Sequence, residues 1–131
     1  MLTPCEVATK CVLPVVRAML AQNLMTEHHM NQVQTAKLLD ISQPAVSLYS
    51  RKMRGKAIDL QGDIDVSRII AGMTESLAKQ ELPRKEFVTK LCELCRTIRA
   101  KGLMCKLHES FDESVDIDDC GLCATPRIKC N

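Results

Sequence analysis

The feature that most constrains the fold is residues 32–49, where two short helical patterns flank a turn signal. The first pattern places Ala36 inward, and so small a side chain lets a second helix cross closely. Asp40 follows where the chain must turn, and Asp tolerates the left-handed conformation that a tight turn needs. Ser42 offers an oxygen to cap the second helix, and Pro44 suits its first turn. The pattern predicts two helices packed across a tight turn.

The rest of the chain also predicts helices. Of the 131 residues, 46% are apolar and only 2% aromatic, so Leu, Ile, Val, Met and Ala must form the core. Apolar residues recur at helical spacing in residues 4–29, 65–80 and 83–102, with a kink or helix boundary expected near Pro14. No alternating pattern is long enough for a strand. We therefore expect an all-α protein, in which a helix-turn-helix bundle precedes further helices and a small Cys-rich tail.

The two later helices carry a cap and an apolar seam. We expect Asp65 or Ser67 to cap the first of them and Pro83 to lie in the first turn of the last. The inward side chains of the first are Val66, Ile69, Ile70, Met73 and Leu77. In the last helix, apolar residues four, three and four apart form a heptad-like seam of Phe87, Leu91, Leu94 and Ile98. We expect this seam to join two copies of the chain as a homodimer.

Charge is distributed unevenly along the chain. The formal net charge is +2, but residues 30–56 have an excess of cations, whereas residues 109–119 carry six carboxylates and no cation. The acidic run lacks the Gly of a calcium loop, which favours a solvated loop. A basic and an acidic block suggest separate tasks. Together with a linker at 56–63, they predict two units, residues 1–62 and 63–131.

The second helix of the pair presents a surface suited to double-stranded DNA. An amide and short polar side chains lie at its front, as base edges in a major groove require, and cations at its rear suit phosphates. The expected contacts are Gln32, Ser42, Gln43, Ala45, Ser47, Leu48, Ser50, Arg51, Lys52 and Arg54. A helical hairpin with a solvated basic face is the alternative. DNA binding is favoured because the whole helix-turn-helix pattern matches and a basic run follows it.

The stretch from Gln32 to Tyr49 resembles the repressor-type helix-turn-helix of the Xre family. A wider set of motifs resembles small archaeal predicted transcriptional regulators with a Cys-rich C-terminal segment. These motifs are Thr3-Pro-Cys-Glu6, Leu13-Pro14 followed by Arg17, Gln43-Pro-Ala-Val-Ser47 and Arg54-Gly55. The resemblance covers most of the chain and implies a dimeric DNA-binding domain of four or five helices. Asp40 stands where that family usually has Gly, and Leu48 where a polar reader is common.

The eight Cys residues are the second unusual feature. We expect a cytoplasmic protein with reduced thiols, because the chain shows neither a secretory signal nor a membrane span. Two CxxC pairs lie 24 residues apart, and residues three apart share one face of a helix. Four thiolates suit an iron–sulfur cluster of the 4Fe–4S type or a tetrahedral zinc ion. The expected ligands are Cys92, Cys95, Cys120 and Cys123, with Cys105 and Cys130 in reserve.

The helical first pair and the surplus thiols favour the cluster, because zinc knuckles sit on short hairpins. We expect a non-enzymatic transcriptional regulator whose cluster senses redox or cluster status. A purely structural zinc site is the first alternative. A thiol oxidoreductase using Cys92 and Cys95 and a protein-interaction adaptor are the others. The remaining expectations are that Cys5 and Cys11 serve in packing and that the adjacent His28 and His29 form a solvated helix end.

Overall fold

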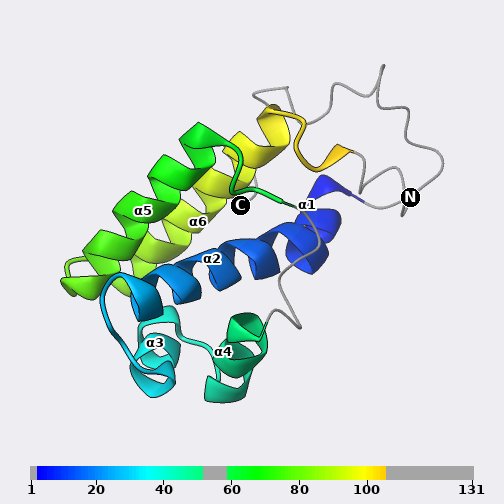
Figure 1. The fold of residues 1–131 in the computed structure, drawn as a ribbon. Helices are drawn as coiled ribbons and strands as arrows, with labels where there is room; N and C mark the ends of the chain where they lie inside the picture. The colour runs from blue at the N-terminus through cyan, green and yellow to red at the C-terminus, as the bar shows by residue number, and fades with distance from the viewer. Residues whose placement is uncertain (1–2, 52–58, 106–131) are drawn as a thin grey trace.

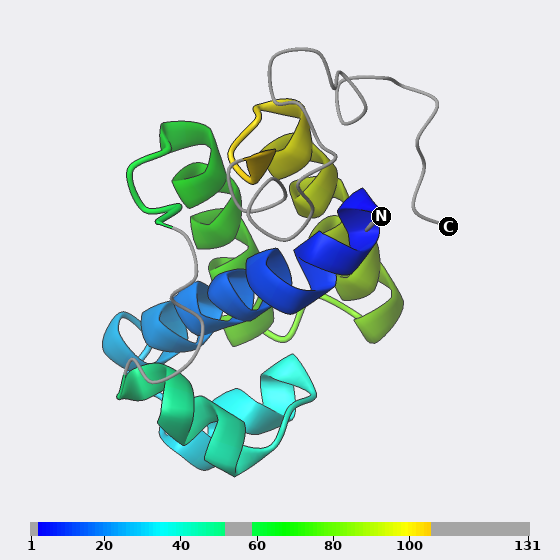
Figure 2. The same ribbon diagram turned by 90° about the vertical axis from the view of Figure 1, so that its right-hand side faces the viewer.

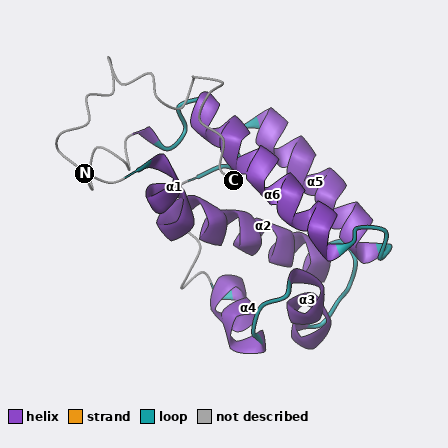
Figure 3. Cartoon of the chain, turned by 180° about the vertical axis from the view of Figure 1, so that it is seen from behind, coloured by secondary structure: helices purple, strands orange, loops and turns teal. Residues whose placement is uncertain are grey.

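The computed structural model describes residues 3–51 and 59–105. In chain order the elements are α1 (Pro4–Val7), the π-helical η1 (Ala8–Val12), α2 (Leu13–Thr26), α3 (Gln32–Leu39), α4 (Gln43–Ser50), α5 (Ile64–Ala78) and α6 (Arg84–Ala100) (Figure 1). The described residues contain no strand, as Figure 3 also shows, and the all-α prediction is confirmed. Among these helices, none combines the length and apolar character that crossing a membrane would require.

Helix α2 forms the centre of the molecule. The α3–α4 pair packs on one side of it and the α5–α6 pair on the other (Figures 1 and 2). Val12 at the end of η1 and Val16 and Leu20 in α2 are at most 1% exposed. A helix that is apolar on nearly every side has to be enclosed by its neighbours, which accounts for this central place.

The expected irregularity before Pro14 is a π-helical segment. Proline has no N–H, and its ring clashes with the preceding turn of a regular α-helix. The wider η1 segment ends in a bond from the Leu13 N–H to the Ala8 carbonyl, and α2 follows. The helical path therefore runs through η1 rather than breaking into two separate helices.

Thr3 and Glu6 begin this path with a reciprocal cap. The Thr3 backbone N–H donates to the Glu6 carboxylate over 2.7 Å, and the Glu6 N–H donates to the Thr3 hydroxyl over 3.4 Å. The bond from the Thr3 N–H holds the pKa of Glu6 below its ordinary value. The Thr3–Glu6 motif thus has a structural role at the first helical turn.

The start of α5 differs from the expectation. Asp63, rather than Asp65 or Ser67, is the N-cap, and its carboxylate accepts a bond of 3.0 Å from the Val66 N–H. The prediction was wrong because the helix begins one residue earlier, at Ile64. Ile69 is also not inward but 37% exposed, whereas the other four predicted apolar positions of α5 are buried.

The apolar seam of α6 lies inside the single chain. All four of its members, Phe87, Leu91, Leu94 and Ile98, are at most 9% exposed and belong to the common core. The prediction that this seam joins two copies was wrong, because the core of the same chain already buries it. The existence of a homodimer stays a prediction.

Both ends of α6 follow simple rules. Pro83 is the N-cap, one residue before the first turn where it was expected. Gly102 adopts a left-handed conformation, φ 72°, and the Leu103 N–H bonds back to the Ile98 carbonyl over 3.2 Å. This closure ends the helix at Ala100.

Helices on both sides of residue 62 share one core. Leu60, in the segment expected to be a linker, is 1% exposed and belongs to that core. The division into residues 1–62 and 63–131 stays a prediction.

Candidate nucleic-acid interface

Helix α3 covers the first of the two predicted helical patterns, and both of its ends are locally determined. At its start, the Asn31 side chain accepts from the Gln34 N–H over 2.8 Å, and the Gln34 side chain accepts from the Asn31 N–H over 3.1 Å. At its end, Asp40 is left-handed with φ 55° and ψ 45°, and the Ile41 N–H bonds to the Ala36 carbonyl over 3.0 Å. The turn expected at Asp40 is confirmed.

Helix α4 crosses α3 after this turn. The Ser42 hydroxyl accepts a bond of 3.2 Å from the Ala45 N–H, and Pro44 lies in the first turn, as expected. Val46 and Tyr49 face the core with exposures of 0% and 7%. The inward positions of α3, Ala36 and Leu39, are 6% and 3% exposed. Because these inward contacts hold the pair against α2, the remaining face of α4 is available to a partner.

The predicted contact residues differ in how far they are available. Gln43, Ser50 and Arg51 are exposed, while Gln32, Ser47 and Leu48 are half-buried. Ala45 packs partly against the core, and Ser42 uses its hydroxyl as the helix cap. Lys52 and Arg54 lie outside the described residues. The Ser50 hydroxyl donates to the Ser47 carbonyl, so the available polar groups are Gln43 at the front of α4 and Arg51 just after its end.

A hydrogen bond joins the first residues of the two helices. The Gln43 amide nitrogen donates to the Gln32 amide oxygen over 2.7 Å. An amide group has two N–H donors and one oxygen with two lone pairs, so the bond leaves Gln43 one donor and its acceptor. Both residues were predicted contacts, but the bond between them was not foreseen. The helix bounds could have indicated it, because each Gln is the first residue of its helix.

The charges around the pair come from three elements. Lys37 and Arg51 are exposed cations on α3 and after α4. Arg84, at the start of α6, forms an ion pair of 3.0 Å with Asp40 in the turn. This pair sets a cation of α6 against the one carboxylate within residues 32–51, and it was not foreseen because 44 positions separate its members.

The first CxxC pair lies on one flank of α6. Cys92, Cys95 and Arg99 are spaced three and four apart and so share a side of the helix. Cys92 is half-buried, Cys95 is 8% exposed and Arg99 is 3% exposed. Arg99 donates from Nη1 to the sulfur of Cys5, 3.4 Å away. We call Cys92, Cys95, Arg99 and Cys5 the thiol flank.

The other thiols vary in environment. Cys11 is buried, as expected of a packing residue, whereas Cys5 also accepts the bond from Arg99. Cys105 is half-buried and follows the turn at Gly102. Nothing in the local sequence could have shown the contact between Cys5 and Arg99, because 94 positions separate them.

Two of the predicted metal ligands fall in the described part of the chain. Cys92 and Cys95 are on the thiol flank, whereas Cys120, Cys123 and Cys130 lie outside the described residues. Within residues 3–51 and 59–105, no three or more His, Cys, Asp or Glu side chains are grouped as a metal ion would require. The four-thiolate site stays a prediction.

His28 and the exposed His29 follow the end of α2, as expected.

Comparison of the chain with protein-family models, with curated proteins and with solved structures gave no match. The resemblance to the Xre family therefore stays an expectation.

Proposed function

We propose that this protein is a DNA-binding transcriptional regulator of the Xre type. In this proposal α3 and α4 form a repressor-type helix-turn-helix, and α4 enters the major groove of operator DNA. One observation carries the proposal: the exposed amide of Gln43 lies at the front of α4 and is oriented by Gln32, with the exposed Arg51 at the other end of the helix.

The oriented amide supports base recognition. Reading adenine in the major groove takes one acceptor for its amino group and one donor for N7, and a side-chain amide supplies both. The bond to Gln32 uses one N–H of Gln43 and leaves this donor and acceptor. Gln32 would thus act as a positioning residue, because it restricts rotation of the Gln43 amide before DNA arrives.

The cations near α4 support phosphate binding. Arg51 follows the helix and Lys37 lies on α3, so both could reach the sugar–phosphate backbone beside the groove. Each phosphate that is neutralised contributes roughly −0.9 to the slope of log affinity against log salt. Arg84 neutralises Asp40, which limits repulsion at the turn.

The proposal is tested by measuring DNA affinity with fluorescence anisotropy, on an operator selected from random duplexes. Gln43→Ala should lower affinity for the selected sequence by about 1–3 kcal/mol and flatten the preference at one base position. Arg51→Ala should instead weaken binding to every sequence and reduce the salt slope by about 1. Arg96→Ala removes an exposed cation from α6 and is the matched control. Unchanged affinity in both test variants would refute this surface.

Variants of Gln32 separate positioning from contact. Gln32→Glu keeps an oxygen that accepts from Gln43, so the base preference should persist, although the added charge lowers affinity overall. Gln32→Leu removes that acceptor, and the preference at the position read by Gln43 should weaken. Equal base preferences in the two variants would contradict the positioning role.

We further propose that Cys92 and Cys95, with Cys120 and Cys123, hold an iron–sulfur cluster of the 4Fe–4S type, with structural zinc as the alternative. The position of the thiol flank supports a sensing role. Helix α6 carries Cys92 and Cys95, and the start of the same helix is paired through Arg84 with Asp40 between α3 and α4. A change at the thiols could therefore alter how α6 supports the DNA-reading pair. When bound, a cluster would supply one-electron chemistry and sensitivity to oxidants.

Anaerobic purification with measurement of iron, sulfide and zinc tests the metal centre. A cluster predicts iron, sulfide and visible absorption, all lost in Cys95→Ser and retained in Cys11→Ser. A colourless protein with one zinc per chain would mean that the site is structural and not a sensor.

The regulator is further proposed to bind as a homodimer, because paired half-sites lie about 34 Å apart and a single helix-turn-helix makes few contacts.

A further inference from the structure

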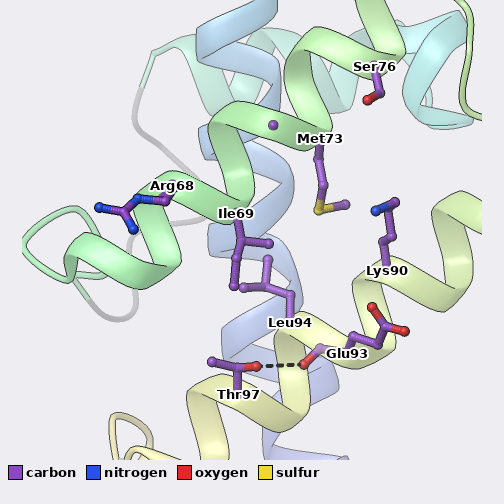
Figure 4. A pocket seen from close by; sticks show the side chains of 9 residues that line it. Arg68, Ile69, Met73, Ser76, Lys90, Glu93, Leu94 and Thr97 are labelled. Carbon is purple, nitrogen blue, oxygen red and sulfur yellow. Dashed lines mark hydrogen bonds between the residues drawn. The ribbon is translucent and has the colours of Figure 1, made fainter.

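The outer side of the α5–α6 pair has an open groove. Figure 4 shows it from the side opposite α2, with Ile69 of α5 and Leu94 of α6 pointing toward each other at its base. Met73 adds to this apolar floor, and the groove has a volume of about 450 Å³. Leu94 and Met73 are only 1% and 3% exposed, so Ile69, at 37%, is the apolar side chain of the groove that is open to a partner.

Gly72 leaves part of this groove empty. It lies in the interior of α5, where Gly is less favourable than Ala. A Cβ added at Gly72 would meet no atom within 4 Å, and no left-handed backbone conformation requires glycine there. Neither the packing of this chain nor its backbone therefore explains the glycine. A group approaching from outside the chain would explain it, because glycine permits close contact with a helix backbone.

Charges of both signs surround the floor. Arg68, Lys90 and Glu93 line the groove and are exposed. Within the part of the chain that the structure describes, none of the three forms an ion pair. A surface with both signs can pair with a copy of itself across a two-fold axis, because each cation then meets the partner's carboxylate.

We propose that this groove is the interface of a homodimer, with a second copy of the chain as its occupant. The same face of the partner lies over Gly72, and Lys90 of each copy pairs with the partner's Glu93. The location supports this arrangement, since the groove is on the outer side of the α5–α6 pair and α2 lies between this pair and the α3–α4 pair (Figures 1 and 2). Both α4 helices therefore remain accessible. The inference rests on the proposed function only in that paired half-sites call for a dimer.

Sedimentation equilibrium of the full chain over a range of concentrations tests the interface. Wild-type protein should associate to a dimer, and Gly72→Trp should raise the dimer dissociation constant at least about tenfold by filling the groove. Ala71→Trp is the matched control, because Ala71 is the neighbouring exposed residue of α5 and does not line the groove. Since the site of Gly72 is open, the variant should fold, as circular dichroism and its melting temperature will show. A monomeric wild type, or equal association of all three proteins, would overturn the proposal.

A charge exchange gives a second test that does not depend on filling space. Lys90→Glu and Glu93→Lys should each weaken the dimer, and the double variant should restore it, because the reciprocal pairs re-form with exchanged signs. A double variant no better than the single ones would contradict this pairing.

Binding to a single half-site separates this inference from the proposed function. Gly72→Trp should leave the affinity for DNA with one half-site unchanged. It should lose the higher affinity that a dimer has for DNA with two half-sites. Dimerisation without any selective DNA binding would overturn the proposed function alone, and selective binding by a wild-type monomer would overturn the interface alone.

Discussion

The α3–α4 pair and helix α6 are both amphipathic, but they differ in how much of their role local sequence determines. Each end of α3 and the start of α4 is closed by bonds between residues at most five apart. Helix α6 was also foreseen as a helix, yet its apolar seam was assigned to a second chain and not to its own core. The comparison shows that capping and turn chemistry predict where helices begin and end, whereas periodicity alone does not say what covers an apolar face.

The largest effect on stability is expected from truncating a buried residue of the α6 seam. Ile98 is completely buried, so Ile98→Ala should lower the free energy of unfolding by about 2–5 kcal/mol. Val88→Ala is the control, because Val88 of the same helix is 49% exposed, and it should lower the free energy of unfolding far less. Urea unfolding at several protein concentrations checks this. If the loss in Ile98→Ala appeared only where the chain is dimeric, the seam would be intermolecular after all.

The left-handed turn gives the next largest effect. Asp40→Ala and Asp40→Gly both remove the ion pair with Arg84. What distinguishes the two variants is how well the new residue tolerates the left-handed φ of 55°. Because a left-handed residue with a Cβ is strained, the Ala variant should be less stable than the Gly variant by about 1–2 kcal/mol. Thermal unfolding of the two proteins measures this difference. Equal stabilities would mean that the turn relaxes when Asp40 is replaced.

The cap of α4 should contribute about as much as an ordinary N-cap. Ser42→Ala removes the acceptor for the Ala45 N–H and should cost about 1 kcal/mol. Ser50→Ala is the matched control, since the Ser50 hydroxyl donates to a carbonyl near the exposed end of the same helix. Chemical denaturation of both variants gives the comparison. A larger loss in the Ser50 variant would show that the start of α4 is held by tertiary contacts and not by its cap.

The smallest effect concerns pH and the contact between α5 and α6. The Val66 N–H, followed by Lys101, holds the pKa of Asp63 below its ordinary value. The bonds from Lys101 to Asp65 and Asp63 raise the pKa of Lys101. The carboxylate therefore stabilises the fold above the ordinary Asp pKa, and this contribution is lost as the pH falls through the lowered value. The Lys101 contribution is present below the ordinary Lys pKa and is lost as the pH rises through the raised value.

Asp63→Asn tests this pH dependence, because Asn is also a good N-cap. The variant should show a flatter decline of stability on the acid side, measured by urea unfolding at a series of pH values. On the alkaline side Asp65 still pairs with Lys101 over 2.6 Å, so part of the dependence should remain. An unchanged acid limb would exclude Asp63 as a source of it.

Much of the fold could be predicted, because its signals are short. The bounds of α3, the turn at Asp40, the cap at Ser42 and the irregularity before Pro14 all depend on neighbouring residues. The cap of α5 was misplaced because several residues near its start can accept an N–H. Ile69 was misplaced because helical spacing defines a broad apolar stripe and not the edge at which burial stops.

In the candidate sites too, residues marked by a local pattern could be predicted, whereas contacts between distant residues could not. The sequence indicated Gln43 and Arg51, whose availability follows from their places at the start of α4 and just after its end. It did not indicate the ion pair of Asp40 with Arg84 or the bond of Arg99 to Cys5, since no local pattern links residues so far apart. The groove at Gly72 was also not foreseen, because an isolated glycine in a helix has no meaning until its surroundings are known.

The sequence by itself determined that this protein is helical and where a tight turn joins two of its helices. Those outcomes depend on backbone hydrogen bonds and side-chain sizes within a few residues. Only the tertiary structure decided that the α6 seam is internal, that Leu60 is buried and that the thiol flank includes Cys5. The physical reason is that burial and distant contacts depend on how the helices pack around α2.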